Sequence, residues 1–248
     1  MSYFTFNGIN SEDLGLIVTR PIVRPTWGEE YVETVIPGRS RVHRRATGNY
    51  NNIEFTIYTS VMDASPETMH SIYQTLSGEG SLIISSSPDE YLDCRLEPLV
   101  PEPVALFAAE IPIGVTAYPF ANSTNPTLTN ITTAGETFLL SNNGTIFSEP
   151  EITFIPEMSE ENDTIFYING QEFKVHTPPE ILDGAISDYT ITINSEAQIV
   201  YYTRPNGEKV NCTQYSYGSF PKLHTGDNYL QHNTLIASGV INMKERYL

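Results

Sequence analysis

The residues that most often carry chemistry in proteins are scattered through this sequence rather than grouped. No two of the five histidines stand at HxH or HxxxH spacing, which would place two imidazole rings on one metal ion. The two cysteines, Cys94 and Cys212, lie in opposite halves of the chain and form no CxxC motif. The sequence also lacks a GxSxG nucleophile elbow, a glycine-rich phosphate loop and an EF-hand pattern. We therefore predict no catalytic residue, no metal site and no cofactor.

Carboxylates are the one reactive group that the chain has in abundance, with 30 Asp and Glu residues. A pair of carboxylates on either side of a glycosidic bond can hydrolyse it, one acting as general acid and the other as nucleophile or base. In a chain with so many acidic residues, a suggestive pair arises by chance and identifies no active site. We predict that the protein is not an enzyme, and a hydrolase stays as an alternative.

The acidic residues give the chain a formal net charge of −17. The charge is even along the chain, because residues 1–124 contain 7 basic and 15 acidic residues and residues 125–248 contain 6 and 15. Such a protein repels phosphate groups, which argues against stable nucleic-acid binding and against an anionic membrane surface. No apolar run approaches the roughly 20 residues of a membrane span, and the first residues do not resemble a signal peptide. We expect a soluble protein with reduced thiols, folded in a cytosol.

One basic segment interrupts this acidic background. The run RSRVHRR (residues 39–45) follows the turn dipeptide Pro37-Gly38. One interpretation is a solvated loop whose charges offset nearby glutamates. The other, which we favour, is an arm whose guanidinium groups meet carboxylates on a neighbouring copy of the chain. The candidate residues of this inter-subunit arm are Gly38, Arg39, Arg41, Arg44 and Arg45.

Tyrosines in the second half form another candidate surface. Exposed tyrosine rings can stack on sugar rings, although most tyrosines at alternate positions of a β-sandwich are packing residues. The tyrosines considered are Tyr167, Tyr201, Tyr202, Tyr215, Tyr217 and Tyr229, and the candidates for contact with a sugar or a partner protein are Tyr201, Tyr202, Tyr215 and Tyr217.

The elements that position these residues are mainly β-strands, with a single clear helix at about residues 65–77. Ser65 can cap that helix and Pro66 occupies its first turn, where a missing N–H costs nothing. Its apolar residues then recur at helical spacing, at Met69, Ile72, Tyr73 and Leu76. The rest of the chain alternates with a period of two between turn signals.

Three Asn-Gly turns predict hairpins in the second half, because this dipeptide accepts the positive φ angles of a tight turn. We expect residues 137–141 to pair with 145–147, residues 164–168 with 172–175, and residues 199–203 with 209–212. Such hairpins indicate an antiparallel β-sandwich. The polar, turn-rich segment 119–126 precedes them, and we place a domain boundary there. The predicted domains are residues 1–125, a β-sandwich with one helix, and residues 126–248, a second sandwich.

Several short motifs occur in an order and spacing similar to those of one known family. They are FTFNGINSEDLGLI (residues 4–17), IPGR (36–39), LIIS and PDEY (82–85 and 88–91), SNNGTIFSEPEI (141–152) and GDN (226–228). Together they resemble the distal tail proteins, Dit, of long-tailed bacteriophages that infect Gram-positive bacteria. Ser40 and Arg41 depart from this pattern, since the family usually has an acidic residue and a glycine after its PGR turn.

The resemblance implies a structural virion protein with a galectin-like second domain. Its first domain would form a homo-hexameric ring that joins the tail tube protein to a tail-tip or tail-associated protein, with DNA passing through the ring. The galectin-like domain would carry receptor-binding proteins or bind a saccharide. The protein would be located at the phage tail tip after assembly in the host cytoplasm. The alternative function is a carbohydrate-binding module that recognises the host cell wall.

Overall fold

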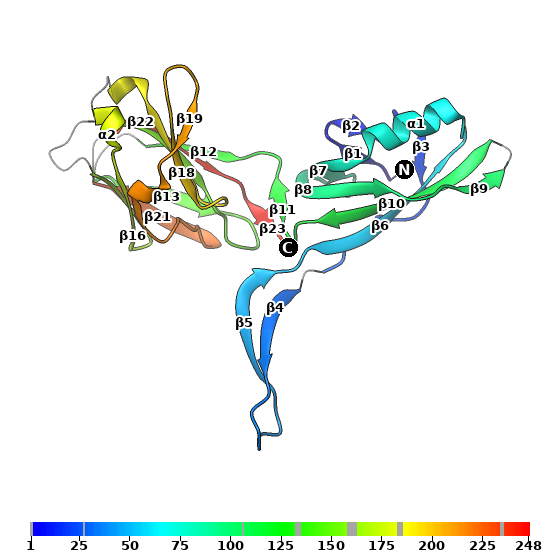
Figure 1. The fold of residues 1–248 in the computed structure, drawn as a ribbon, viewed down its shortest axis with the longest axis horizontal. Helices are drawn as coiled ribbons and strands as arrows, with labels where there is room; N and C mark the ends of the chain where they lie inside the picture. Colours follow the sequence, from blue (N-terminus) through cyan, green and yellow to red (C-terminus); the bar gives the residue numbers. More distant parts are fainter. Residues whose placement is uncertain are drawn as a thin grey trace. The chain divides into compact units, whose positions relative to one another are not determined.

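The computed structural model describes residues 2–26, 28–105, 107–131, 135–157, 163–182, 186–233 and 236–248. Contacts between Cα atoms divide the chain into two compact units (Figure 1). The N-terminal unit runs through Thr124 and includes Tyr247 and Leu248, and the C-terminal unit comprises Asn125–Arg246. Antiparallel strands dominate both units, which confirms the predicted mainly-β fold.

The N-terminal unit is built on one antiparallel sheet whose central path runs in the order β2-β1-β7-β8-β10-β6-β3. These strands are β1 (Phe4–Phe6), β2 (Ile9–Asn10), β3 (Leu16–Val18), β6 (Ile53–Val61), β7 (Gly78–Ile84), β8 (Ser87–Pro98) and β10 (Ala108–Ala117). Two short strands pair beside them, β9 (Glu102–Ala105) with β10 and β11 (Ala121–Ser123) with β8. The last strand of the chain is β23 (Arg246–Tyr247), and Tyr247 packs against the core of this unit.

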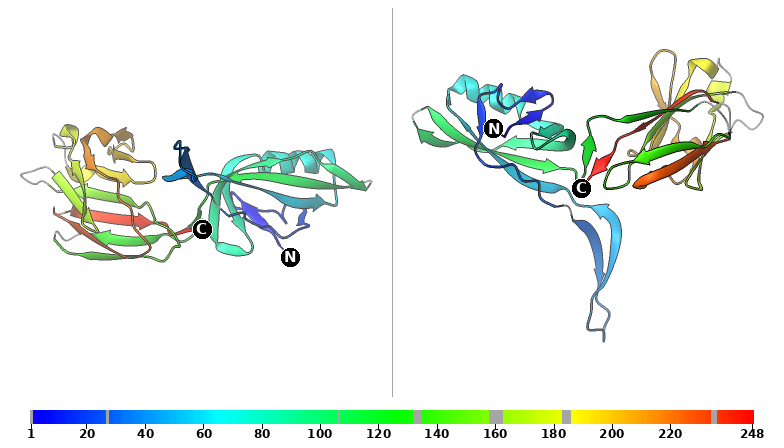
Figure 2. Two further views of the ribbon diagram at one scale, coloured as in Figure 1. Left: turned by 90° about the horizontal axis from the view of Figure 1, so that it is seen from below. Right: turned by 180° about the vertical axis from the view of Figure 1, so that it is seen from behind.

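Helix α1 (Pro66–Thr75) lies along one face of this sheet, as Figures 1 and 2 show. Ser65 caps it by accepting a hydrogen bond from the Thr68 N–H at 3.4 Å. Ile72 and Leu76 are fully buried in one cluster with Ile57, Ile111 and other sheet residues. The predicted helix is therefore confirmed, and its apolar stripe closes the core of the N-terminal unit.

The basic run (residues 39–45) is divided between a turn and a strand: residues 39–42 lie between the strands of a hairpin, and residues 43–45 begin its second strand. Strand β4 (Glu29–Thr34) and strand β5 (His43–Tyr50) pair only with one another, in a two-stranded sheet of their own. This hairpin, which we call the arm (residues 29–50), extends away from the main sheet in Figures 1 and 2. Strand β5 could not be predicted from its sequence, HRRATGNY, because this segment has no alternating apolar pattern.

The C-terminal unit is a sandwich of two antiparallel sheets with Phe154 and Phe166, one from each sheet, in edge-to-face contact at 5.3 Å between ring centroids. The six-stranded sheet runs in the order β12 (Thr127–Ile131), β22 (Ile236–Met243), β14 (Glu151–Pro156), β17 (Thr190–Asn194), β18 (Ile199–Thr203) and β19 (Lys209–Asn211). The five-stranded sheet runs in the order β13 (Phe138–Asn142), β21 (Gly226–His232), β15 (Asp163–Ile168), β16 (Gln171–His176) and β20 (Ser216–Gly218). Short helical turns connect strands at α2 (Pro179–Leu182), η1 (Ile186–Asp188) and η2 (Thr213–Tyr215).

Two of the three predicted hairpins are confirmed. Strand β15 pairs with β16 across Asn169-Gly170, and β18 pairs with β19 across the turn that contains Gly207. The hairpin across Asn142-Asn143-Gly144 was wrong, because β13 pairs with β21 instead. The Asn142 side chain accepts from the Gly144 N–H and donates to the Ile146 carbonyl, so this loop is closed by a side chain rather than by strand pairing.

Candidate assembly surfaces

The arm ends in a turn that its sequence specifies. The Arg39 N–H donates to the Ile36 carbonyl at 3.1 Å, with Pro37 and Gly38 between them. Gly38 has a φ of +86°, which a type II turn requires at its third position and which glycine adopts without strain. The turn reverses the chain and places Arg39 and Arg41 at the end of the arm, both exposed.

The two faces of the arm differ in their charge pairing. On one face, Arg44 forms an ion pair with Glu33 at 2.7 Å, and the Tyr31 hydroxyl donates to Glu29 at 2.9 Å. That hydrogen bond, together with the Glu29 charge, raises the pKa of Tyr31. On the other face, Arg45 stands opposite Val32 in the strand register. Since opposite residues of an antiparallel pair point to the same side, Val32 and Arg45 lie side by side on this second face.

The arm is exposed over almost its whole surface. Its large apolar side chains remain open to solvent, with exposed fractions of 51% for Tyr31, 55% for Val32, 76% for Val35 and 45% for Val42. An isolated two-stranded hairpin has little stability of its own in water. The exposed valines make this hairpin unusually apolar for an element that is open to solvent.

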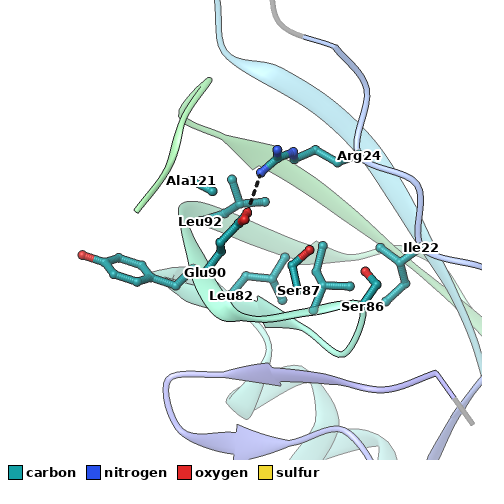
Figure 3. A pocket seen from close by; sticks show the side chains of 10 residues that line it. Ile22, Arg24, Leu82, Ser86, Ser87, Glu90, Leu92 and Ala121 are labelled. Atoms are coloured by element: carbon teal, nitrogen blue, oxygen red, sulfur yellow. Dashed lines mark ion pairs between the residues drawn. The ribbon is translucent and has the colours of Figure 1, made fainter. Parts of the chain in front are cut away.

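The arm is attached at its base through the segment that precedes it. Arg24 forms an ion pair with Glu90 at 3.6 Å, as Figure 3 shows. It also donates to the Leu248 carbonyl at 2.6 Å. It lines a cavity of about 120 Å³ together with Ile22, Tyr91 and other residues. On the other strand of the arm, Tyr50 contacts Phe120 edge-to-face, with ring centroids 4.8 Å apart. This cavity is too small for a sugar ring, and its polar groups serve to hold the chain segments together.

The four candidate tyrosines do not form one surface. Tyr201 and Tyr202 lie on β18 of the six-stranded sheet, whereas Tyr217 lies on β20 of the five-stranded sheet. Tyr202 is only 4% exposed and its hydroxyl donates to Glu180 at 2.5 Å, so its ring is not available for stacking on a ligand. Burial is the main cause that raises the pKa of Tyr202. Tyr215 lies in η2 beside His176, at 6.5 Å between ring centroids.

Tyr217 is the one of the four that is widely exposed, at 61%. Two further exposed tyrosines accompany it on the five-stranded sheet, Tyr167 at 37% and Tyr229 at 56%. Tyr229 stands opposite Leu139, which is also exposed. Tyr167 on β15 pairs with Gln231 on β21, and Tyr229 lies two residues before Gln231 on the same strand. The strand register therefore places both tyrosine rings on the outer face of the sheet, which the sequence alone could not show.

Metal-binding clusters and reactive thiols are the remaining kinds of candidate site. Among the described residues, no group of three or more His, Cys, Asp or Glu is placed to bind a metal ion. Cys94 and Cys212 are free thiols and buried. Burial raises the pKa of Cys94 to about 12 and that of Cys212 to about 11, so both thiols stay protonated at neutral pH. None of the helices within the described segments is long and apolar enough to cross a membrane.

No protein-family model matches the sequence, and no curated protein matches it. A solved structure does match the fold: the SPP1 Dit (gp 19.1) protein, described as a paradigm of the hub adsorption apparatus in phages that infect Gram-positive bacteria. The alignment has a TM-score of 0.72 at 14% sequence identity, and it covers 100% of this chain and 100% of the SPP1 protein. Over its whole length, the chain has the fold of a phage distal tail protein.

Proposed function

We propose that this protein is a structural component of a bacteriophage tail tip, in which six copies form a ring between the tail tube and the tip. The observation that carries this proposal is the full-length similarity of both units to SPP1 Dit, whose published description is a hub of an adsorption apparatus. At 14% sequence identity, the similarity of the two proteins concerns the fold alone. The assembly therefore has to be argued from this chain's own surfaces.

The arm supports self-assembly. It concentrates four of the seven arginines of the first half of the chain at an exposed hairpin, in a protein with a net charge of −17. Guanidinium groups pair well with carboxylates, and every further copy of this chain supplies a surplus of them. The exposed valines of the arm add apolar area that contact with another copy would remove from water.

A ring between the tail tube and the tip would contact other tail proteins. It would contact the tail tube protein on one side and a tail-tip or tail-associated protein on the other. The C-terminal units would carry receptor-binding proteins. The acidic chain would repel the DNA that passes through the ring rather than bind it. The protein would act in the virion after assembly in the host cytoplasm, without catalysis and without a cofactor.

Light scattering on a size-exclusion column tests the ring directly, over a range of protein and salt concentrations. We expect a species of six times 27.7 kDa. Reversing the charge of the arm, with Arg44→Glu and Arg45→Glu, should abolish that species while circular dichroism stays unchanged. A hexamer that persists in this variant contradicts the role of the arm, and a wild-type chain that is monomeric at every concentration contradicts the ring.

Carbohydrate binding is the second candidate, and the exposed tyrosines of the five-stranded sheet favour it. Aromatic rings on a sheet face can stack on pyranose rings, and Gln231 and Glu172 offer hydrogen-bonding groups on either side of Tyr167. Retention of the isolated protein on host cell-wall polysaccharide would support this function. Substitution of Tyr217 and Tyr229 by Ala should then abolish retention, whereas Tyr201→Ala, on the other sheet, should leave it unchanged.

A further inference from the structure

The N-terminal unit contains a groove whose charge is opposite to that of the arginine-rich end of the arm. It encloses about 590 Å³ between the loop before β3, the end of β6 and the first turns of α1. Its lining residues are Asp13, Leu14, Gly15, Val61, Met62, Asp63, Glu67, Thr68 and Ser71. We call it the acidic groove. It is lined by three carboxylates and by no basic residue. The fold brings these acids into one groove from positions as far as 54 residues apart in the sequence, Asp13 and Glu67.

The carboxylates of the groove differ in their roles within the chain. Asp63 accepts hydrogen bonds from the Ser65 backbone N–H at 3.1 Å and from the Thr68 hydroxyl at 3.3 Å, so it helps to begin helix α1. The side chains of Asp13 and Glu67 are exposed and have no hydrogen bond or ion pair within the described part of the chain. Their negative charge is therefore available to a cationic partner.

The groove has an apolar border. Met62, which lines it, is 70% exposed. The Ala64 N–H donates to the Phe107 carbonyl at 2.8 Å, which brings Phe107, itself 69% exposed, next to the same segment. Large apolar side chains this exposed beside a charged groove are typical of a protein contact surface. The groove thus combines negative and apolar groups, whereas the end of the arm combines the exposed Arg39 and Arg41 with the exposed Val35 and Val42.

The arm and the groove lie at opposite ends of one strand. Strand β5 of the arm ends at Tyr50 and leads into β6, which begins at Ile53, whereas the groove is lined by Val61 at the end of β6. The nine residues of β6 span about 26 Å at about 3.3 Å per residue. Figure 1 shows the arm extending away from the sheet at the β6 start. This arrangement separates the arm of a copy from its own groove.

We infer that the arm of one copy docks in the acidic groove of a second copy, with Arg41 and Arg45 facing Asp13 and Glu67. This inference rests on the proposed ring and names the surface that receives the arm. The contact joins two different patches of the chain, so it is heterologous, and repetition of such a contact gives a ring when the rotation from one copy to the next closes on itself. The occupant is a second copy of this chain because the chain itself carries the complementary hairpin.

Two charge-reversed chains test the docking. The first, the arm variant, carries Arg41→Glu and Arg45→Glu. The second, the groove variant, carries Asp13→Arg and Glu67→Arg. Alone, each variant opposes like charges across the contact, and we expect the protein concentration at half-assembly to rise about tenfold or more in light scattering.

Mixing the two variants in equal amounts should restore the ring. The negative arm of the first variant then meets the positive groove of the second, and the unaltered arm of the second meets the unaltered groove of the first. An even number of copies can close in this alternating order. A loss of assembly caused by misfolding would not be rescued by mixing, so rescue identifies a contact between copies.

The control is a chain with the same change of charge as the groove variant but in the C-terminal unit, Glu136→Arg and Glu157→Arg, at two exposed positions. We expect this chain to assemble as the wild type does and to give no rescue when mixed with the arm variant. Assembly of the groove variant at wild-type concentrations, or a mixture that stays monomeric, overturns the docking while leaving the ring intact. A monomeric wild-type chain overturns both.

Discussion

A buried asparagine side chain gives the GDN motif (residues 226–228) a structural role. Asn228, in the GDN motif, is fully buried and donates to the carbonyls of Leu140, His224 and Gly226. Its side-chain oxygen accepts from the His224 N–H at 2.8 Å. Buried backbone groups need partners, and a short amide side chain supplies a donor and an acceptor together. The asparagine of this motif therefore has a structural role: it supplies hydrogen-bond partners to backbone groups inside the C-terminal unit.

The first prediction concerns this side chain. Asn228→Ala should lower the free energy of unfolding by about 2–3 kcal/mol, because it leaves buried carbonyls and an N–H without partners. Urea unfolding measures the difference. Gln171→Ala, at an exposed position, should change it by less than about 0.5 kcal/mol. An Asn228→Ala chain as stable as the wild type would mean that water replaces the amide at no cost.

The second prediction concerns the pH dependence of Asp163. Burial by itself raises the pKa of this carboxyl, but hydrogen bonds and charges from Lys174 and His176 outweigh it and hold the pKa below its usual value of 3.8. A carboxyl with a lowered pKa in the folded state stabilises the protein above the unfolded pKa, and this contribution is lost as the pH falls through 3.8 and below.

Replacing this carboxyl should therefore matter more at neutral pH than in acid. We expect Asp163→Asn to be less stable than the wild type at pH 7 and to differ from it much less at pH 3, as measured by urea unfolding at both pH values. A difference in stability that is the same at pH 7 and pH 3 would contradict the lowered pKa.

At the scale of the elements, helix α1 shows how local signals and packing act together. Ser65 satisfies an N–H of the first turn, while Ile72 and Leu76 attach the helix to the sheet. Ser65→Ala should cost about 1 kcal/mol of unfolding free energy, as loss of an N-cap usually does. The matched control is Ser71→Ala, the same substitution at an exposed position within the helix, which should be neutral or slightly stabilising. Equal effects of the two substitutions in thermal unfolding would show that the cap contributes nothing.

At the scale of the whole molecule, the chain combines an acidic body with one basic arm. Contacts between exposed charges weaken as salt screens them, over a Debye length of about 8 Å at physiological ionic strength. We expect added salt to weaken the ring, so the protein concentration at half-assembly should rise by roughly threefold or more between about 0.05 and about 0.5 M salt. Light scattering at fixed pH measures it, and a ring whose stability is independent of salt would show that the valines of the arm dominate the contact.

The sequence by itself determined the elements whose signals are local. The cap, the first-turn proline and the apolar spacing specify α1, and Asn169-Gly170 specifies the β15–β16 turn, because each depends only on backbone angles of neighbouring residues. The same is true of Pro37-Gly38 at the end of the arm. The resemblance to distal tail proteins also came from such local motifs.

Tertiary structure alone decided the arrangements that depend on distant residues. The pairing of β13 with β21, the burial of Tyr202 and the outer face shared by Tyr167 and Tyr229 all follow from strand register. Asp13 and Glu67 line one groove only because the loop before β3, the end of β6 and helix α1 lie next to one another in the folded unit. The sequence could identify the basic arm from its composition, since its charges are consecutive. It could not identify the groove, since contacts between residues far apart in the chain are set by the packing of the whole unit.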